Sequence, residues 1–585
     1  MKNIIAIRSR LDQSVCTRLA LLVLVAVAGF LLHLPSELGM SLAIPPDSNE
    51  YAIGLAGLFE HGTFGFSLNG EWHPSRYAPW FSLFCLSPAY ILFGCDVLTL
   101  HWSVLAFALA FLVISYYMAK LAGLGKWSFL CAILPLFIPD FVFYSRMAMT
   151  EIPYTALFAA SALLFVRLVD EKSPSLRFCL GAGAIVAWCG TVRVTALPML
   201  VLFVVALLAK RRGWRKKIVS VLVLCGPAVV YEIAVLSYNW RVFGSLFRSG
   251  YNYWVPVPYD FTELTFSVDL AIRNATRYLH EPLVVITLIL VAIVVVVTLL
   301  IMHGLFGGRR ENKNFLLLSG YVLFQGAVLF SLYVGYYYYD ERFFLPVALC
   351  SVPLSFAALA RMTRGLGVKI ASATLVCAVI VVVQCFRVAQ PEYSYMAVGY
   401  PFRIVEAKMT SAVIPYGSVV IIEGNPCMLD HFGFREKRLE LFPINRDFDY
   451  VRDMYALASI SKFEPRPKAY TQLIVPEIVA SGACVLPFPD TFEENPERVK
   501  MYLKENRRVF LQRGVACNPN TEESKRIFAT LDRMGLTARE FGVWSVPEIR
   551  ANPVRHLYDR IVFPGFSMDS RSEVKSVYYE ISPKH

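Results

Sequence analysis

The stretch PDSNEYAI, residues 46–53, directly follows the first apolar segment of a chain that is rich in such segments. It places two carboxylates, those of Asp47 and Glu50, at the edge of a hydrophobic block. Charged side chains close to hydrocarbon are costly, and those that occur there tend to be paired, hydrated or functional. The fold and the function both depend on what the other apolar segments place around these carboxylates.

The composition indicates a membrane protein with a soluble part. Of the 585 residues, 56% are hydrophobic and only 17% are charged, whereas soluble proteins carry about 25% charged residues. The apolar blocks end near residue 390, so we predict a transmembrane domain at 1–390 and an extracytoplasmic α/β domain at 391–585. The net charge of +12 comes mainly from basic residues at the ends of apolar blocks, which is typical of topology signals and not of nucleic-acid binding.

The apolar blocks predict a polytopic helical fold, because a helix needs about 20 apolar residues to cross a bilayer. Segment 79–94 is shorter and carries two prolines, so we expect an interfacial or re-entrant helix on the outer side. With that choice every inner loop carries Lys or Arg, the N-terminus is cytoplasmic and the C-terminal domain is outside the cell membrane. The eleven expected spans are 17–37, 97–119, 127–145, 152–169, 178–192, 195–209, 217–238, 282–303, 314–335, 343–361 and 368–387.

This topology places the candidate catalytic carboxylates, Asp47 and Glu151, on the outer face together with Glu50. Asp47 and Glu50 are three residues apart, which puts them on one face of a helix that Pro46 would start. One interpretation is a helix cap with a solvated neighbour. The other is a carboxylate that faces a cavity at the membrane surface and acts as a general base for an acceptor hydroxyl or amine.

Further polar residues of the outer face are candidates for substrate binding. An arginine holds a phosphate through two parallel hydrogen bonds, although the same side chain near a membrane can simply reach lipid headgroups. Aromatic residues beside them, such as the four tyrosines 336–339, suit a sugar or a lipid tail. These candidates are Glu50, His73, Arg76, Arg146, Asp340 and Arg342.

Six short elements occur in an order and spacing that match a known family. They are Asp47 with Tyr51-Ala52, Arg76 with Pro79 and Leu92-Phe93-Gly94, Arg146 with Thr150-Glu151, Thr191-Val192-Arg193-Val194-Thr195, Tyr238-Asn239 with Phe243-Gly244-Ser245, and Asp340-Glu341-Arg342-Phe343 with Leu345-Pro346. Through them residues 15–390 resemble the integral-membrane C-type (GT-C) glycosyltransferases, the class of the protein O-mannosyltransferases and the lipid A aminoarabinose transferase. Asp47 is followed by Ser48, where the O-mannosyltransferases carry an adjacent Asp-Glu pair.

The resemblance implies a GT-C fold of about 11 transmembrane helices plus interfacial helices. It also implies a polyprenyl-phosphate sugar donor and an inverting transfer to a lipid, glycan or protein of the cell envelope. Asp47 takes the essential acidic position and Glu151 the second one, and the two would be the ligands if the enzyme used Mg²⁺ or Mn²⁺. Arg76 stands where relatives carry a basic residue before prolines.

Two other hypotheses remain open at this point: a transporter or flippase for polyprenyl-linked sugars, and a non-enzymatic envelope assembly protein. The spans show no internal repeat, although secondary transporters usually have paired halves. In the C-terminal domain, apolar runs predict strands at 418–422 and 508–511, and helices are expected at 496–505 and 522–534.

Overall fold

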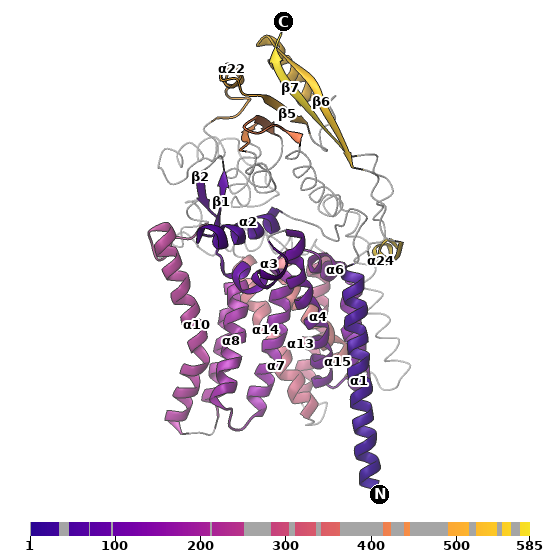
Figure 1. Ribbon diagram of the computed structural model, residues 1–585. Coiled ribbons are helices and arrows are strands. Elements are labelled where there is room, and N and C mark those ends of the chain that lie inside the picture. Colours follow the sequence, from indigo (N-terminus) through magenta and orange to yellow (C-terminus); the bar gives the residue numbers. More distant parts are fainter. Residues whose placement is uncertain are drawn as a thin grey trace.

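The computed structural model consists of a helical bundle with an additional sheet near the C-terminus (Figure 1). The expected span 368–387 and the candidates Arg76 and Asp340 lie outside the described residues. The structure describes residues 2–33, 46–68, 71–75, 77–94, 97–210, 213–250, 282–303, 310–334, 341–362, 413–422, 438–444, 490–513, 522–546, 553–562 and 574–584.

Five helical segments of the described residues are long and apolar enough to cross a membrane. They belong to α4 (Val97–Leu121), α7 (Glu151–Asp170), α10 (Trp214–Phe243), α14 (Arg310–Val334), and the 3₁₀ turn η5 (Glu341–Phe344) with α15 (Leu345–Met362). A sixth candidate is broken: residues Ser128–Phe137 and helix α6 (Pro139–Ser145) pass the test together but meet at 72°.

The remaining expected spans correspond to shorter apolar helices, so the total of eleven stays a prediction. They are Cys16–Leu32 within α1 (Lys2–His33), α8 (Leu176–Val192), η4 (Val194–Met199) with α9 (Leu200–Leu208), and Thr287–Met302 within α13 (Pro282–Met302). Helices α8 and α10 approach closely at Gly183, where an added Cβ would lie 1.9 Å from the carbonyl oxygen of Leu224. Small residues allow such close contacts between membrane helices.

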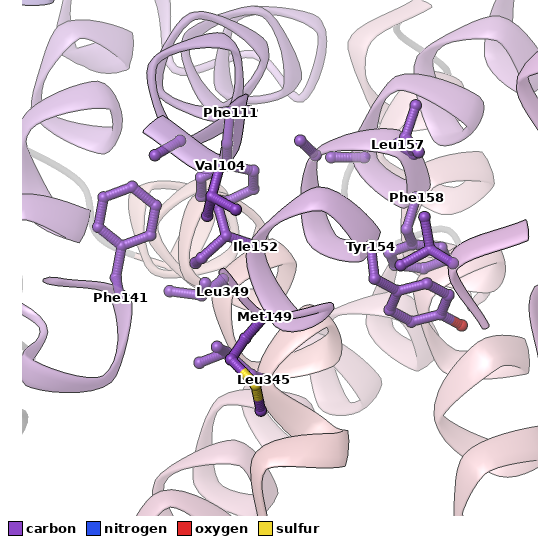
Figure 2. Packing of buried hydrophobic residues seen from close by; sticks show 14 of the residues in the cluster. Val104, Phe111, Phe141, Met149, Ile152, Tyr154, Leu157, Phe158, Leu345 and Leu349 are labelled. Atoms are coloured by element: carbon purple, nitrogen blue, oxygen red, sulfur yellow. The ribbon is translucent and has the colours of Figure 1, made fainter. Parts of the chain in front are cut away.

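Helix α7 is the centre of the bundle. It packs against α4, α8 and α15, and Figure 2 shows its Ile152 among side chains of α4 and α15 such as Val104 and Leu349. A helix that is apolar on all sides is expected to be buried in this way. A polar residue on α7 is therefore placed inside the bundle unless it lies at one of the two ends.

The two ends of α7 both carry a carboxylate, and they differ in their surroundings. At its C-terminal end, Asp170 pairs with Lys313 at 2.8 Å and with the largely exposed Arg310 at 3.2 Å. At its N-terminal end, Glu151 is fully buried. The 20-residue helix separates the two ends by about 29 Å, which is close to the thickness of the hydrocarbon layer.

The segments at the Glu151 end form a layer across the bundle (Figure 1). Helix α2 (Pro46–His61) begins at Pro46 as expected and is followed by the hairpin β1 (Gly65–Leu68) and β2 (Glu71–Pro74). Segment 79–94 contains a π-helical turn η1 (Ser82–Leu86) and α3 (Ser87–Phe93). Ser82 Oγ donates to the Tyr51 carbonyl at 3.3 Å, which ties this segment to α2.

Near the C-terminus the described strands form a five-stranded mixed sheet with the order β4-β3-β5-β7-β6. Strand β3 (Val419–Ile422) is parallel to both β4 (Glu440–Pro443) and β5 (Val509–Arg513), while β7 (Val574–Pro583) is antiparallel to both β5 and β6 (Leu536–Val546). The expected strands β3 and β5 and the expected helices α22 (Arg498–Lys504) and α23 (Glu522–Arg533) are all present. The boundary at residue 391 stays a prediction.

Candidate functional site

The site is built around Glu151, the first residue of α7. Its side chain has no exposed surface, and Arg193 Nη2 donates to its Oε1 at 2.6 Å. Arg193 also donates to Thr150 Oγ1 through Nε at 3.2 Å and Nη2 at 2.8 Å. A carboxylate at the N-terminus of a helix interacts favourably with the aligned peptide dipoles, so Glu151 has attractive contacts with both the helix end and Arg193.

The second carboxylate, Asp47, is brought to the same place by α2. Ser48 Oγ donates to the carbonyl of Ala148 at 3.3 Å and so attaches the start of α2 to the turn before α7. Arg342 then joins the two carboxylates: its Nη1 and Nη2 both lie 3.3 Å from Asp47 Oδ2, and its Nε lies 3.5 Å from Glu151 Oε1.

The ion pairs join two carboxylates and two guanidinium groups into one cluster, which we call the four-charge cluster. Its members are Asp47, Glu151, Arg193 and Arg342. Its members differ in exposure: the side chain of Glu151 has 0% of its surface exposed, Arg193 11%, Asp47 13% and Arg342 17%. Glu151 is therefore the enclosed member, and Asp47 and Arg342 are the more exposed ones.

Aromatic rings lie near the two guanidinium groups. The ring of Phe343 lies 4.5 Å from Arg193 Cζ and 5.5 Å from Arg342 Cζ, and the ring of Tyr154 lies 5.9 Å from Arg193 Cζ. A cation over an aromatic face gains about 0.5–2 kcal/mol, with the larger values at desolvated sites. These rings shield one side of each arginine and restrict the directions in which it can turn.

A buried hydrogen-bonded layer supports Arg193 from below. Gln325 of α14 donates from Nε2 to Tyr154 Oη at 2.5 Å and to the Thr195 carbonyl at 3.1 Å, and the hydroxyls of Tyr154 and Thr195 are 3.4 Å apart. Arg193 has an extended backbone, with φ −149° and ψ 120°, between α8 and η4. These hydrogen bonds thus stabilise the backbone between α8 and η4, where Arg193 is located.

The structure brings three of the predicted site residues together, namely Asp47, Glu151 and Arg342. Glu50 lies one turn further along α2 and is partly buried. His73 is buried in β2 with its ring 5.6 Å from that of Phe66.

Arg146 is buried close to the site but serves another contact in this structure. It donates to the Leu31 carbonyl at 3.4 Å, and its Cζ lies 5.8 Å from the ring of Tyr558. It therefore joins the end of α1 to α24 (Pro553–Val562).

Arg193 is the member of the cluster that was not among the predicted site residues. It belongs to the short element 191–195 of the resemblance, and it interrupts two apolar segments that are both too short for an ordinary span. A charged residue between two short apolar segments is the signal that identifies it, because such residues within membrane proteins are usually paired or functional.

The four-charge cluster does not fit a divalent cation. Asp47 and Glu151 both accept from guanidinium groups, which already neutralise them. Among the residues that the structure describes, no group of three or more His, Cys, Asp or Glu side chains is arranged to hold a metal ion.

No protein-family model matches this sequence, and no curated protein is similar to it. The fold is similar to that of ArnT from Cupriavidus metallidurans bound to undecaprenyl phosphate, with a TM-score of 0.52 and 11% sequence identity over 96% of this chain and 97% of ArnT. The apo state of the same protein gives a TM-score of 0.48 at 11% identity, covering 97% and 98% of the two chains. AglB from Archaeoglobus fulgidus, an oligosaccharyltransferase, gives 0.44 at 11% identity, covering 92% and 74%.

The first of these similarities confirms the resemblance to the C-type glycosyltransferases at the level of the fold. It extends over nearly the whole length of both chains. The TM-scores of the other two are too low to carry an argument.

Proposed function

We infer that this chain, built on the fold of the C-type glycosyltransferases, transfers a sugar from a polyprenyl-phosphate donor to an acceptor of the cell envelope. The observation that carries this proposal is the four-charge cluster at one end of the bundle, where α2 covers the start of α7. Basic residues gather at the opposite end, around Asp170 and Arg361. By the positive-inside rule that end is cytoplasmic, so the proposed reaction takes place on the outer face.

Arg342 is the proposed ligand of the donor phosphate. Charge-assisted hydrogen bonds from nitrogen are normally about 2.7–2.9 Å long, and Arg193 meets Glu151 at 2.6 Å. Arg342 is held more loosely, at 3.3 Å from Asp47 and 3.5 Å from Glu151. It is also more exposed than Arg193, so it can turn toward a phosphate while Arg193 keeps Glu151 in place. Arg76 is proposed as a second phosphate ligand.

Asp47 is the proposed general base. Arg342 pairs with Asp47 at 3.3 Å. A phosphodiester adds one negative charge to a cluster whose formal charges cancel, and it draws Arg342 away. Asp47 is then available to accept the proton of the acceptor once the donor is bound.

The proposed transfer is a single displacement. The acceptor oxygen or nitrogen attacks the anomeric carbon from the face opposite the phosphate, and its proton passes to Asp47. The bond between the anomeric carbon and the phosphate oxygen breaks, and the polyprenyl phosphate leaves with the electron pair. Arg342 stabilises the negative charge that develops on the leaving phosphate, which is the kind of interaction that contributes most to enzymatic rate.

Glu151 and Arg193 are proposed to set the geometry and the charge of the site. The enclosed pair also contacts Arg342, because Glu151 Oε1 lies near both arginines. A neutral residue in place of Glu151 would leave two arginines close together with one carboxylate. We therefore expect Glu151→Gln to lower turnover by a change in the pocket's electrostatics.

The experiment has two readouts, so that the proposal can be separated from its rivals. The purified protein in lipid vesicles is tested for binding of undecaprenyl phosphate, and cells are tested by mass spectrometry of envelope lipids and glycans with and without the gene. A transferase should bind the probe and leave a glycosylated product that needs Asp47. A flippase would keep lipid translocation in the Asp47→Asn variant, and an assembly protein would be indifferent to that change.

A further inference from the structure

Helix α24 (Pro553–Val562) connects the C-terminal sheet to the membrane bundle. It lies in the connection between β6 and β7, the antiparallel pair at the edge of the sheet, and it is seen beside the upper end of α1 in Figure 1. Tyr558 Oη donates to the Leu136 carbonyl at 2.6 Å, and Tyr558 and Val562 are buried. One face of α24 is therefore docked on the bundle.

A second face of α24 is apolar and uncovered. Val554, Leu557 and Ile561 have 48%, 62% and 56% of their surface exposed. Their spacing of three and four residues places them on one side of the helix. In a helix that only linked two parts of a soluble domain, this side would be expected to be polar.

The uncovered face continues an apolar rim on the bundle. Phe137, next to the residue that accepts from Tyr558, is 43% exposed, and Phe30, next to Leu31 at the end of α1, is 57% exposed. Arg146 ties these parts together, because it contacts both the Leu31 carbonyl and the Tyr558 ring. The exposed side of the bundle near α24 is thus of the kind that faces lipid.

We propose that α24 is an interfacial helix, whose apolar face enters the surface of the bilayer beside α1. An amphipathic helix with a basic polar part binds membranes in this way, and α24 carries Arg555, His556 and Arg560 with one acidic residue, Asp559. The occupant of the uncovered face is therefore lipid, with anionic headgroups favoured by the two arginines. The inference does not depend on the proposed glycosyl transfer.

Lipid binding by α24 would also position the C-terminal sheet. Helix α24 lies between β6 and β7 in the chain. Its binding to lipid therefore attaches the sheet to the membrane surface as well as to the bundle. The docking residue Arg146 belongs to the turn between α6 and α7 that leads to Thr150 and Glu151. Binding of α24 to lipid would thus stabilise the turn between α6 and α7, which precedes Glu151.

The test uses the full chain with the photoreactive residue p-benzoylphenylalanine at position 557. The matched control carries it at position 501 of α22, because Met501 is also an apolar residue with 45% of its surface exposed, but it belongs to the sheet region. After irradiation in membranes, mass spectrometry should find severalfold more lipid adduct at 557 than at 501. Equal lipid labelling at the two positions, or an adduct of 557 mainly with another polypeptide, would overturn the proposal.

The choice of lipid is tested in vesicles of phosphatidylcholine with and without phosphatidylglycerol. Each basic residue near an anionic surface contributes ~1 kcal/mol, or about fivefold in binding. The lipid adduct at 557 should therefore increase with phosphatidylglycerol, and Arg560→Gln should reduce that increase. An adduct yield that is the same in both vesicles would contradict the role given to the arginines.

Discussion

The substitution Arg193→Gln tests the four-charge cluster as a unit. It removes the guanidinium that donates to Glu151 at 2.6 Å and to Thr150, while Arg342 remains 3.5 Å from Glu151. Removal of one partner from a buried ion pair costs about 3–5 kcal/mol, because the other charge is left uncompensated. Arg342 compensates Glu151 in part, so we expect a loss near 3 kcal/mol, at the lower end of that range.

The matched control is at the other end of the same helix. Asp170→Asn also removes a carboxylate from an ion-paired cluster, but its partners Arg310 and Lys313 have 80% and 52% of their side chains exposed. Exposed ion pairs contribute about 0–1 kcal/mol. Unfolding of both variants in detergent, followed by tryptophan fluorescence, should therefore show a large loss of stability for Arg193→Gln and a small one for Asp170→Asn.

A double-mutant cycle gives the sharper result. Arg193→Gln combined with Glu151→Gln leaves no uncompensated carboxylate at this position, so the double variant should be more stable than the sum of the two single losses predicts. Residues in direct contact show interaction energies of about 0.5–3 kcal/mol in such cycles. Additive losses, or a loss below about 1 kcal/mol for Arg193→Gln alone, would refute the view that Glu151 depends on Arg193.

Three further predictions concern the phosphate ligand, the supporting layer and the C-terminal sheet. Arg342→Ala should weaken binding of undecaprenyl phosphate about ten- to a hundredfold, since a hydrogen bond to a charged group contributes about 1.5–3 kcal/mol; unchanged affinity would remove Arg342 from the donor site. Gln325→Leu should lower turnover more than donor binding, because it removes the donor to Tyr154 beneath Arg193; unchanged kcat in a folded variant would contradict this positioning role. Burial, together with the bond to Glu440, raises the pKa of Tyr502 above its usual value near 10. Its contribution to stability is therefore complete below about pH 10 and is lost as the pH rises further, and Tyr502→Phe should reduce the alkaline loss of stability seen by circular dichroism.

The sequence predicts the parts of the site that depend on local pattern. Asp47, Glu151 and Arg342 stand out because each is a charge at the end of an apolar segment, where it is costly unless paired. Arg193 was missed as a site residue, since its pairing with Glu151 depends on how α7 and α8 cross. The role of Arg146 as a substrate ligand stays a prediction, and its contacts with Leu31 and Tyr558 are not predicted by local pattern because they join segments far apart in the chain.

The C-terminal sheet also has strands that local pattern predicts and strands that depend on tertiary contacts. Strands β3 and β5 are runs of buried apolar residues, and both were predicted from that pattern. Strands β6 and β7 contain charged residues between apolar ones, and neither was predicted. Their pairing with each other across the long connection that holds α24 depends on tertiary contacts, and periodicity carries no information about those.

The most direct test of the central claim is to measure donor binding and turnover together in the Asp47→Asn variant. Asp47→Asn keeps the shape of the side chain and removes its basicity, and general-base catalysis typically contributes about 10²–10⁴-fold in rate. Turnover should fall by about that factor, whereas undecaprenyl phosphate should bind as well as before or better, because Arg342 loses its competing carboxylate. Asp170→Asn should leave both quantities unchanged. Near-normal turnover in a folded Asp47→Asn protein would contradict the account, and Asp47 would then be a helix cap paired with Arg342.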